Sequence, residues 1–123
     1  LPEEQCDAEE VASYIEKAGR KVFLIPGNLE DENFCSQLVE EANKKLGGLD
    51  ILTLVAGYQK SVDDIEKIKT EDIKKTFTTN VFSLFWLIKA AIPYLPAGSS
   101  IITTSSIQAF QPNQPLCKEP GNR

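Results

Sequence analysis

Small or polar residues follow each of three short apolar runs in this chain. Asn28 comes just after KVFLI, Gly57 follows LDILTLVA, and Ser106 follows SSIITTS. In open parallel sheets, ligands bind beyond the carboxyl ends of the strands. If the three runs are parallel strands, these residues therefore predict a small-molecule site at one sheet edge.

Asn80 is a fourth candidate, because asparagine competes with the helix backbone and Asn80 stands in the middle of a long helical pattern. We interpret it as hydrogen-bonding to the carbonyl of a neighbouring strand. Simpler readings stay open for the others. Ser106 could be one more hydroxyl in TTSS, Asn28 could only make a turn, and Ala56 and Gly57 could only allow a tight strand exit.

Composition excludes several functions. The 123 residues suit one domain, and 41% hydrophobic with 25% charged residues is typical of a globular protein. A formal charge of −5 argues against binding nucleic acid or anionic membranes. The absence of histidine removes histidine-based triads and most zinc sites, so no metal site is predicted.

Three widely spaced cysteines, Cys6, Cys35 and Cys117, form no CxxC pair, which favours the cytoplasm. Cys35 is interpreted as a small buried apolar residue.

Apolar periodicity sets the elements that must position the candidate residues. Spacings of three and four predict helices over 3–18, 31–46 and 70–92, and the apolar runs predict strands over 21–25, 49–55 and 99–105. The alternation predicts an α/β fold with a parallel sheet whose strands are covered on both faces. The last helix also carries Phe82, Phe85 and Trp86, so we expect it to be buried or to lie in a subunit interface.

The three strand ends resemble those of the short-chain dehydrogenase/reductase family. LGGLDILTLVAG resembles the family's fourth strand and its Asn-Asn-Ala-Gly turn, of which Ala56 and Gly57 remain. TFTTNVFSLFWLIKAAIPYL resembles the helix with the catalytic asparagine, here Asn80, and SIITTSSIQAF resembles the fifth strand with the catalytic serine, here Ser106. The LVAG and SSIQAF variants look like a bacterial oxidoreductase branch with an extended N-terminal arm.

PGNLED resembles the end of the family's third strand, so that Asn28 and Leu29 would contact the adenine. The resemblance implies a partial Rossmann-like, doubly wound parallel sheet over 1–112, comprising the family's strands three to five. It also implies NAD or NADP as cofactor, a small carbonyl compound or alcohol as substrate, and a homo-oligomer formed through the helix at 70–95. No nucleic-acid or membrane partner is expected.

Two family features are missing. The Gly-rich turn would precede Leu1, and the Tyr-x-x-x-Lys pair would fall on Glu119 and Arg123, within an irregular tail at 113–123. We therefore expect a fragment that is inactive alone; the alternative is a non-catalytic interaction domain that keeps the scaffold and the dimer helix.

Without the family's first two strands, the run at 21–25 would lie about 14 Å from the run at 49–55. We expect the chain either to close this gap by pairing the two runs or to be prone to aggregation.

Overall fold

A computed structural model describes residues 2–107 of the chain. The predicted tail at 113–123, with Glu119 and Arg123, lies outside the described residues, as does Cys117. The helices are α1 (Pro2–Lys17), α2 (Glu32–Leu46), η1 (Ile65–Lys67), α3 (Thr70–Phe77), η2 (Thr78–Phe82), α4 (Ser83–Ala91) and η3 (Ile92–Tyr94). The strands are β1 (Ile51–Leu54) and β2 (Ser100–Thr103).

The ends of α2 follow from local chemistry. Asp31 is its N-cap, and its carboxylate accepts a hydrogen bond of 2.8 Å from the backbone N–H of Asn33. Gly47 ends the helix in the left-handed region at φ 82°, and its N–H donates to the carbonyl of Asn43. The helix predicted over 31–46 is thus confirmed, with Asp31 as its cap.

Strands β1 and β2 form a parallel pair in the register Ile51 with Ser100 to Leu54 with Thr103. The hydrogen bonding continues past the last paired residues, because the N–H of Thr104 donates to the carbonyl of Leu54 at 3.0 Å. The connection between the two strands contains the long helix, as expected for parallel strands. The predicted parallel α/β architecture is therefore confirmed.

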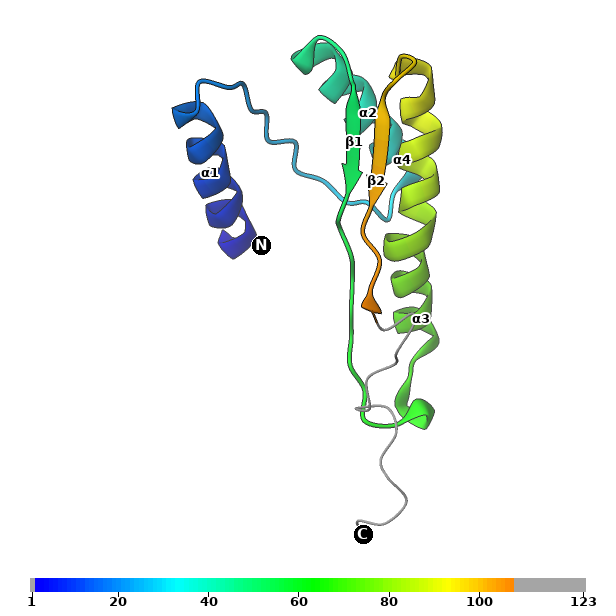
Figure 1. The fold of residues 1–123 in the computed structure, drawn as a ribbon. Coiled ribbons are helices and arrows are strands. Elements are labelled where there is room, and N and C mark those ends of the chain that lie inside the picture. The colour runs from blue at the N-terminus through cyan, green and yellow to red at the C-terminus, as the bar shows by residue number, and fades with distance from the viewer. Residues whose placement is uncertain (1, 108–123) are drawn as a thin grey trace.

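The core lies between β1 and the two helices α2 and α4, which pack against each other and lie on the same side of the sheet in Figure 1. Among residues 2–107, the buried apolar residues of this core are Cys35, Val39, Leu49, Leu54, Leu87 and Ala91. Cys35 is completely buried, as the sequence suggested. These residues explain why β1 and the helices at 32–46 and 83–91 form one unit.

The predicted strand at 21–25 is not formed. This stretch is extended but belongs to no sheet, and the side chains of Phe23 and Leu24 are 41% and 46% exposed. An apolar run becomes a strand only when a neighbour pairs with its backbone, and no described strand does so here. The prediction of three strands is thus wrong for this run, and the expected closure of the gap by pairing with 49–55 does not occur.

Coverage of the sheet on both faces is also wrong for the described chain. Leu54 is buried against the core, whereas Ile51 and Val55, which alternate with it, are 65% and 64% exposed. Helix α1, in blue in Figure 1, stands apart from the two strands and does not cover this face.

The predicted long helix is continuous from Thr70 but changes its winding. Helix α3 leads into the π-helical turn η2, then into α4 and the 3₁₀ turn η3, where Pro93 ends the α-helical part. Lys69 occupies the N-cap position, and no side chain caps this end.

Candidate functional site

The side chain of Asn80 holds the backbone just after β1. Its Oδ1 accepts from the N–H of Tyr58 at 2.6 Å, and its Nδ2 donates to the carbonyl of Tyr58 at 2.8 Å. One amide group thus satisfies both backbone polar groups of a residue outside any ladder. Asn80 was predicted to bond to the carbonyl of a neighbouring strand. The bond to a carbonyl is present, but this carbonyl belongs to Tyr58 in the chain just after β1 and not to the strand itself.

A π-helical turn puts Asn80 in this position. The N–H of Ser83 donates to the carbonyl of Thr78, one residue further back than in an α-helix. The carbonyl of Thr79, which would otherwise accept that N–H, instead accepts from the hydroxyl of Ser83 at 2.6 Å, and Ser83 is buried. Such single π turns are frequent at functional sites, and their extra residue changes which side chains face a neighbour. The sequence pattern gave no sign of the altered winding.

Gly57 and Ala56 directly precede Tyr58, which Asn80 holds by two hydrogen bonds. A Cβ on Gly57 would stand 3.8 Å from Asn80 Oδ1, an ordinary contact, so packing does not by itself require glycine here. Both residues are exposed. Their small size leaves the backbone at the end of β1 accessible.

Ser106 and Asn80 both lie at the end of the sheet where the two parallel strands finish. Ser106 comes two residues after Thr104, whose N–H donates to the carbonyl of Leu54, the last residue of β1. Four residues after Leu54 comes Tyr58, whose N–H donates to Asn80. Ser106 is exposed and makes a polar contact. The two candidate catalytic residues are therefore not on opposite sides of the molecule.

Asn28 and Leu29 occupy a tight turn that leads into α2. The Oδ1 of Asn28 accepts from the N–H of Glu30 at 3.0 Å, and its carbonyl accepts from the N–H of Asp31 at 3.2 Å. Leu29 packs against the core, and its carbonyl accepts from the thiol of Cys35 at 3.5 Å. The turn reading of Asn28 is thus confirmed, and its exposed side chain stays available for a further contact.

Gly27 precedes this turn and is needed for packing. A Cβ at this position would overlap the ring of Phe34 on α2. The turn is therefore fixed on α2, although the run that leads into it is not part of a sheet.

Charged side chains join the loop after β1 to α3. Lys60 Nζ lies 2.9 Å from both carboxylate oxygens of Asp72, and this hydrogen bonding raises the pKa of Lys60. Lys75 Nζ lies 4.6 Å from the centre of the Tyr58 ring and 3.5 Å from Glu30 Oε1. Sequence reasoning did not find Tyr58, Lys60 or Lys75, because nothing in the local pattern indicates which loop a helix will meet.

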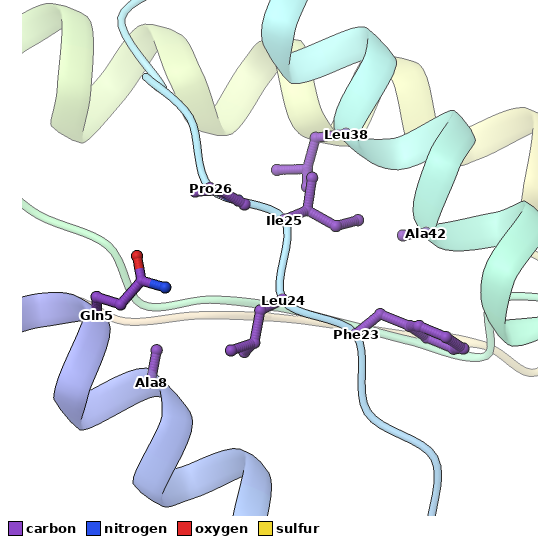
Figure 2. Close-up of a pocket in the computed structure, with 8 residues that line it drawn as sticks. All are labelled: Gln5, Ala8, Phe23, Leu24, Ile25, Pro26, Leu38 and Ala42. Atoms are coloured by element: carbon purple, nitrogen blue, oxygen red, sulfur yellow. The ribbon is translucent and has the colours of Figure 1, made fainter.

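An open pocket lies elsewhere, between α1, the extended run and α2, and its volume is about 520 Å³. Apolar side chains predominate in its lining (Figure 2). Its lining residues are Gln5, Ala8, Phe23, Leu24, Ile25, Pro26, Leu38 and Ala42. None of the predicted site residues lines it, so we do not take it as the reaction site.

Two further features bear on ligands. Within residues 2–107 no helix has the length and apolar character needed to cross a membrane. The same residues contain no group of three or more acidic or cysteine side chains placed to hold a metal ion.

Comparison with known proteins gives the class. The short chain dehydrogenase family matches residues 2–117, which is most of the chain. The chain therefore belongs to the short-chain dehydrogenase/reductase family. The α/β layering, the parallel strand pair and the polar carboxyl edge agree with this assignment.

Two relatives show how similar the chain is to individual proteins. The uncharacterized oxidoreductase YhxD of Bacillus subtilis is 59% identical over 116 residues, which cover 94% of this chain and 39% of that protein. The chloroplastic NADPH-dependent aldehyde reductase 1 of Arabidopsis thaliana is 30% identical over 118 residues, or 93% of this chain and 41% of that protein. The chain spans about two fifths of the length of these relatives.

A solved structure shows the same arrangement. The short chain dehydrogenase of Burkholderia cenocepacia in complex with NADP superposes with a TM-score of 0.81 at 29% identity. The match covers 85% of this chain and 42% of that one.

Proposed function

We propose that this chain is the central part of a longer NAD(P)-dependent oxidoreductase that interconverts a small carbonyl compound and an alcohol. The observation that carries the proposal is the shared edge at which Asn80 holds the end of β1 and Ser106 follows β2. The names of the relatives, all oxidoreductases or reductases in the cases above, support the same reaction class.

The residues fit part of a nicotinamide dinucleotide. Exposed Ala56 and Gly57 leave backbone accessible to a flat ring, and Asn28 offers an amide at the neighbouring turn. Anionic pyrophosphate is usually held by a glycine-rich turn at a helix N-terminus. The described glycines with positive φ do not provide one at this edge: Gly47, Gly48 and Gly98 precede the strands, and Gly19 precedes the extended run. The chain thus fits the adenine and nicotinamide ends and needs another segment for the phosphates.

Each candidate residue has a role in this proposal. The Ser106 hydroxyl would donate a hydrogen bond to the substrate oxygen, where a preorganised donor stabilises developing negative charge. Asn80 would keep the strand exit in place, so that Ala56 and Gly57 face the cofactor. Asn28 and Leu29 would line the adenine end. The cofactor, when bound, supplies or accepts the hydride.

Alone, the chain is proposed to be inactive. It supplies no tyrosine at the position of the family's proton donor, and loss of a general acid typically costs about 10²–10⁴ in rate. Glu119, which falls on that position, would need a strongly raised pKa to serve instead. The cytoplasm is the proposed location, on the grounds of cysteine usage.

The test is to read the flanking coding sequence and to assay the protein it encodes. We expect a Gly-rich turn upstream, a Tyr-x-x-x-Lys segment downstream, and oxidation of NADPH or NADH by that protein with small aldehydes. Ser106→Ala should lower kcat by at least tenfold. A closed reading frame without both motifs, or an assay without activity, would contradict the proposal.

A second candidate, a non-catalytic interaction domain, is favoured by the apolar surface of the long helix. Phe77, Phe82 and Phe85 lie on the long helix and are 53%, 49% and 68% exposed, whereas Ser83, Leu87 and Ala91 of the same helix are buried. Exposed aromatic clusters of this kind mark protein interfaces. Both candidates predict self-association through 70–95, which sedimentation of Phe85→Glu against the unchanged chain tests. Only the enzyme predicts turnover.

A further inference from the structure

The ammonium group of Lys75 on α3 contacts two segments that are proposed to bind the cofactor, the turn at Asn28 and the loop at Gly57. Lys75 Nζ lies 3.5 Å from Glu30 Oε1 and 4.6 Å from the centre of the Tyr58 ring. An ammonium group at that distance from an aromatic face is attracted by its quadrupole. The same group therefore meets a carboxylate on one side and an aromatic ring on the other.

Each partner of Lys75 is part of a segment held by its own hydrogen bonds. The N–H of Glu30 donates to Asn28 Oδ1, so Glu30 belongs to the turn at the adenine end. The backbone of Tyr58 is held at both polar groups by Asn80, beside Gly57. Displacement of either segment would thus move a contact of Lys75.

No backbone pairing connects these two segments among the described residues, because the run before Asn28 is not in the sheet. Strands that are neighbours in a sheet have their ends spaced by the ladder itself. Here the turn and the loop are spaced by their packing on α2 and on the long helix, with Lys75 as the side chain between them.

We propose that Lys75 is a positioning residue that sets the spacing between the turn at Asn28 and the loop at Gly57. This inference rests on the proposed function, since it is the cofactor that would bind across both segments. Lys75 is not a catalytic residue, because it acts through Glu30 and Tyr58. Both contacts are partly exposed, with the Lys75 side chain 48% accessible, so the effect is on geometry more than on stability.

The test is energetic coupling in the isotope-labelled chain, measured from amide resonances in solution. Glu30→Gln removes one charge at the turn. In the otherwise unchanged chain this substitution should shift the amide resonance of Tyr58 as well as those of the turn. We call this effect at Tyr58 the transferred shift. In a Lys75→Met background the same change should leave the Tyr58 resonance in place. This is a double-mutant cycle read at a site remote from the substitution.

Two variants separate positioning from general charge effects. Lys75→Arg retains a cation that can pair with Glu30 and stack on Tyr58, and it should restore the transferred shift. Lys74→Met removes the same charge from the neighbouring position and should leave the transfer intact. All of these substitutions are at accessible positions, and circular dichroism checks that the variants keep their helices.

The proposal is overturned if Glu30→Gln leaves Tyr58 unchanged, if the transfer survives in Lys75→Met, or if Lys74→Met abolishes it equally. The readout needs no cofactor. Failure of the encoded longer protein to use NADPH or NADH would contradict the proposed function, whereas loss of the transferred shift would contradict the positioning role alone.

Discussion

Two apolar runs of similar composition behave differently in this chain. LDILTLV contains β1, whose Leu54 is buried, and its exit is held by Asn80 through both polar groups of Tyr58. KVFLI is equally rich in strand-forming residues, yet it is extended, unpaired in the described sheet and close to half exposed at Leu24.

Tertiary context decides which of the two runs is a strand. The first run has a helix layer on one face and β2 at one edge, so that burial and hydrogen bonding act together. The second run has α2 beside its end, at Gly27 and Phe34, but no strand at its edge among residues 2–107. Strand propensity reflects fit to a half-buried sheet surface more than an intrinsic backbone preference.

The largest expected difference is between two leucines, one from each run. Leu54→Ala should lower the free energy of unfolding by about 2–4 kcal/mol, because it leaves a cavity in the core. Leu24→Ala should cost less than about 0.5 kcal/mol, since the side chain is 46% exposed. Urea denaturation followed by circular dichroism measures both. Equal costs would show that the second run is packed as a strand.

Asn80→Leu should cost about 2 kcal/mol, because it leaves the N–H and carbonyl of Tyr58 without their partner in a partly buried place. Asn33→Leu, on an exposed position of α2, is the matched control and should be close to neutral. The same denaturation assay applies. If the two asparagine variants are alike, Asn80 does not hold the strand exit.

Gly27→Ala tests whether the extended run at 21–25 is packed against α2 at Gly27. The added methyl group overlaps the ring of Phe34, so we expect a cost of about 1–2 kcal/mol from overpacking. In a Phe34→Leu background the same substitution should cost much less, which a double-mutant cycle measures. An unchanged cost in that background would mean that the ring is not the obstacle.

A smaller effect is expected from alkaline pH. Burial, followed by the charge of Asp31, raises the pKa of the Cys35 thiol above its ordinary value of 9.0. The folded state therefore favours the protonated thiol. Its contribution to stability is complete below pH 9 and is lost as pH rises through the folded pKa. Cys35→Ala should reduce the slope of the unfolding free energy against pH above 9. An unchanged slope in this variant would contradict the burial of the thiol.

Much of the fold could be predicted from local rules. Asp31 and Gly47 mark the ends of α2 by their own chemistry, and the apolar spacing from Ile73 to Ile92 gives the long helix. Asn80 was found because its residue type is unusual in a helix interior. These features depend on residues that are close in the sequence, so they can be predicted without knowledge of the tertiary structure.

The rest depends on contacts that the sequence does not encode locally. The π turn at Thr78–Phe82 has no pattern that distinguishes it from an α-helix, and Lys75 meets Tyr58 and Glu30 only because the fold brings three segments together. The run at 21–25 was expected to be a strand because its apolar composition is typical of strands. A prediction from composition takes for granted that a neighbouring strand is there to pair with the run. Whether a neighbour exists is a property of the whole sheet.

Hydrogen exchange at single amides tests the contrast between the two runs most directly. We predict strong protection of the amides of Thr104, which donates to Leu54, and of Tyr58, which donates to Asn80. The amides of Phe23 and Leu24 should exchange at close to the rate of an unstructured chain. Protection of Phe23 and Leu24 equal to that of Thr104 would contradict this prediction, since the second run would then be a paired strand.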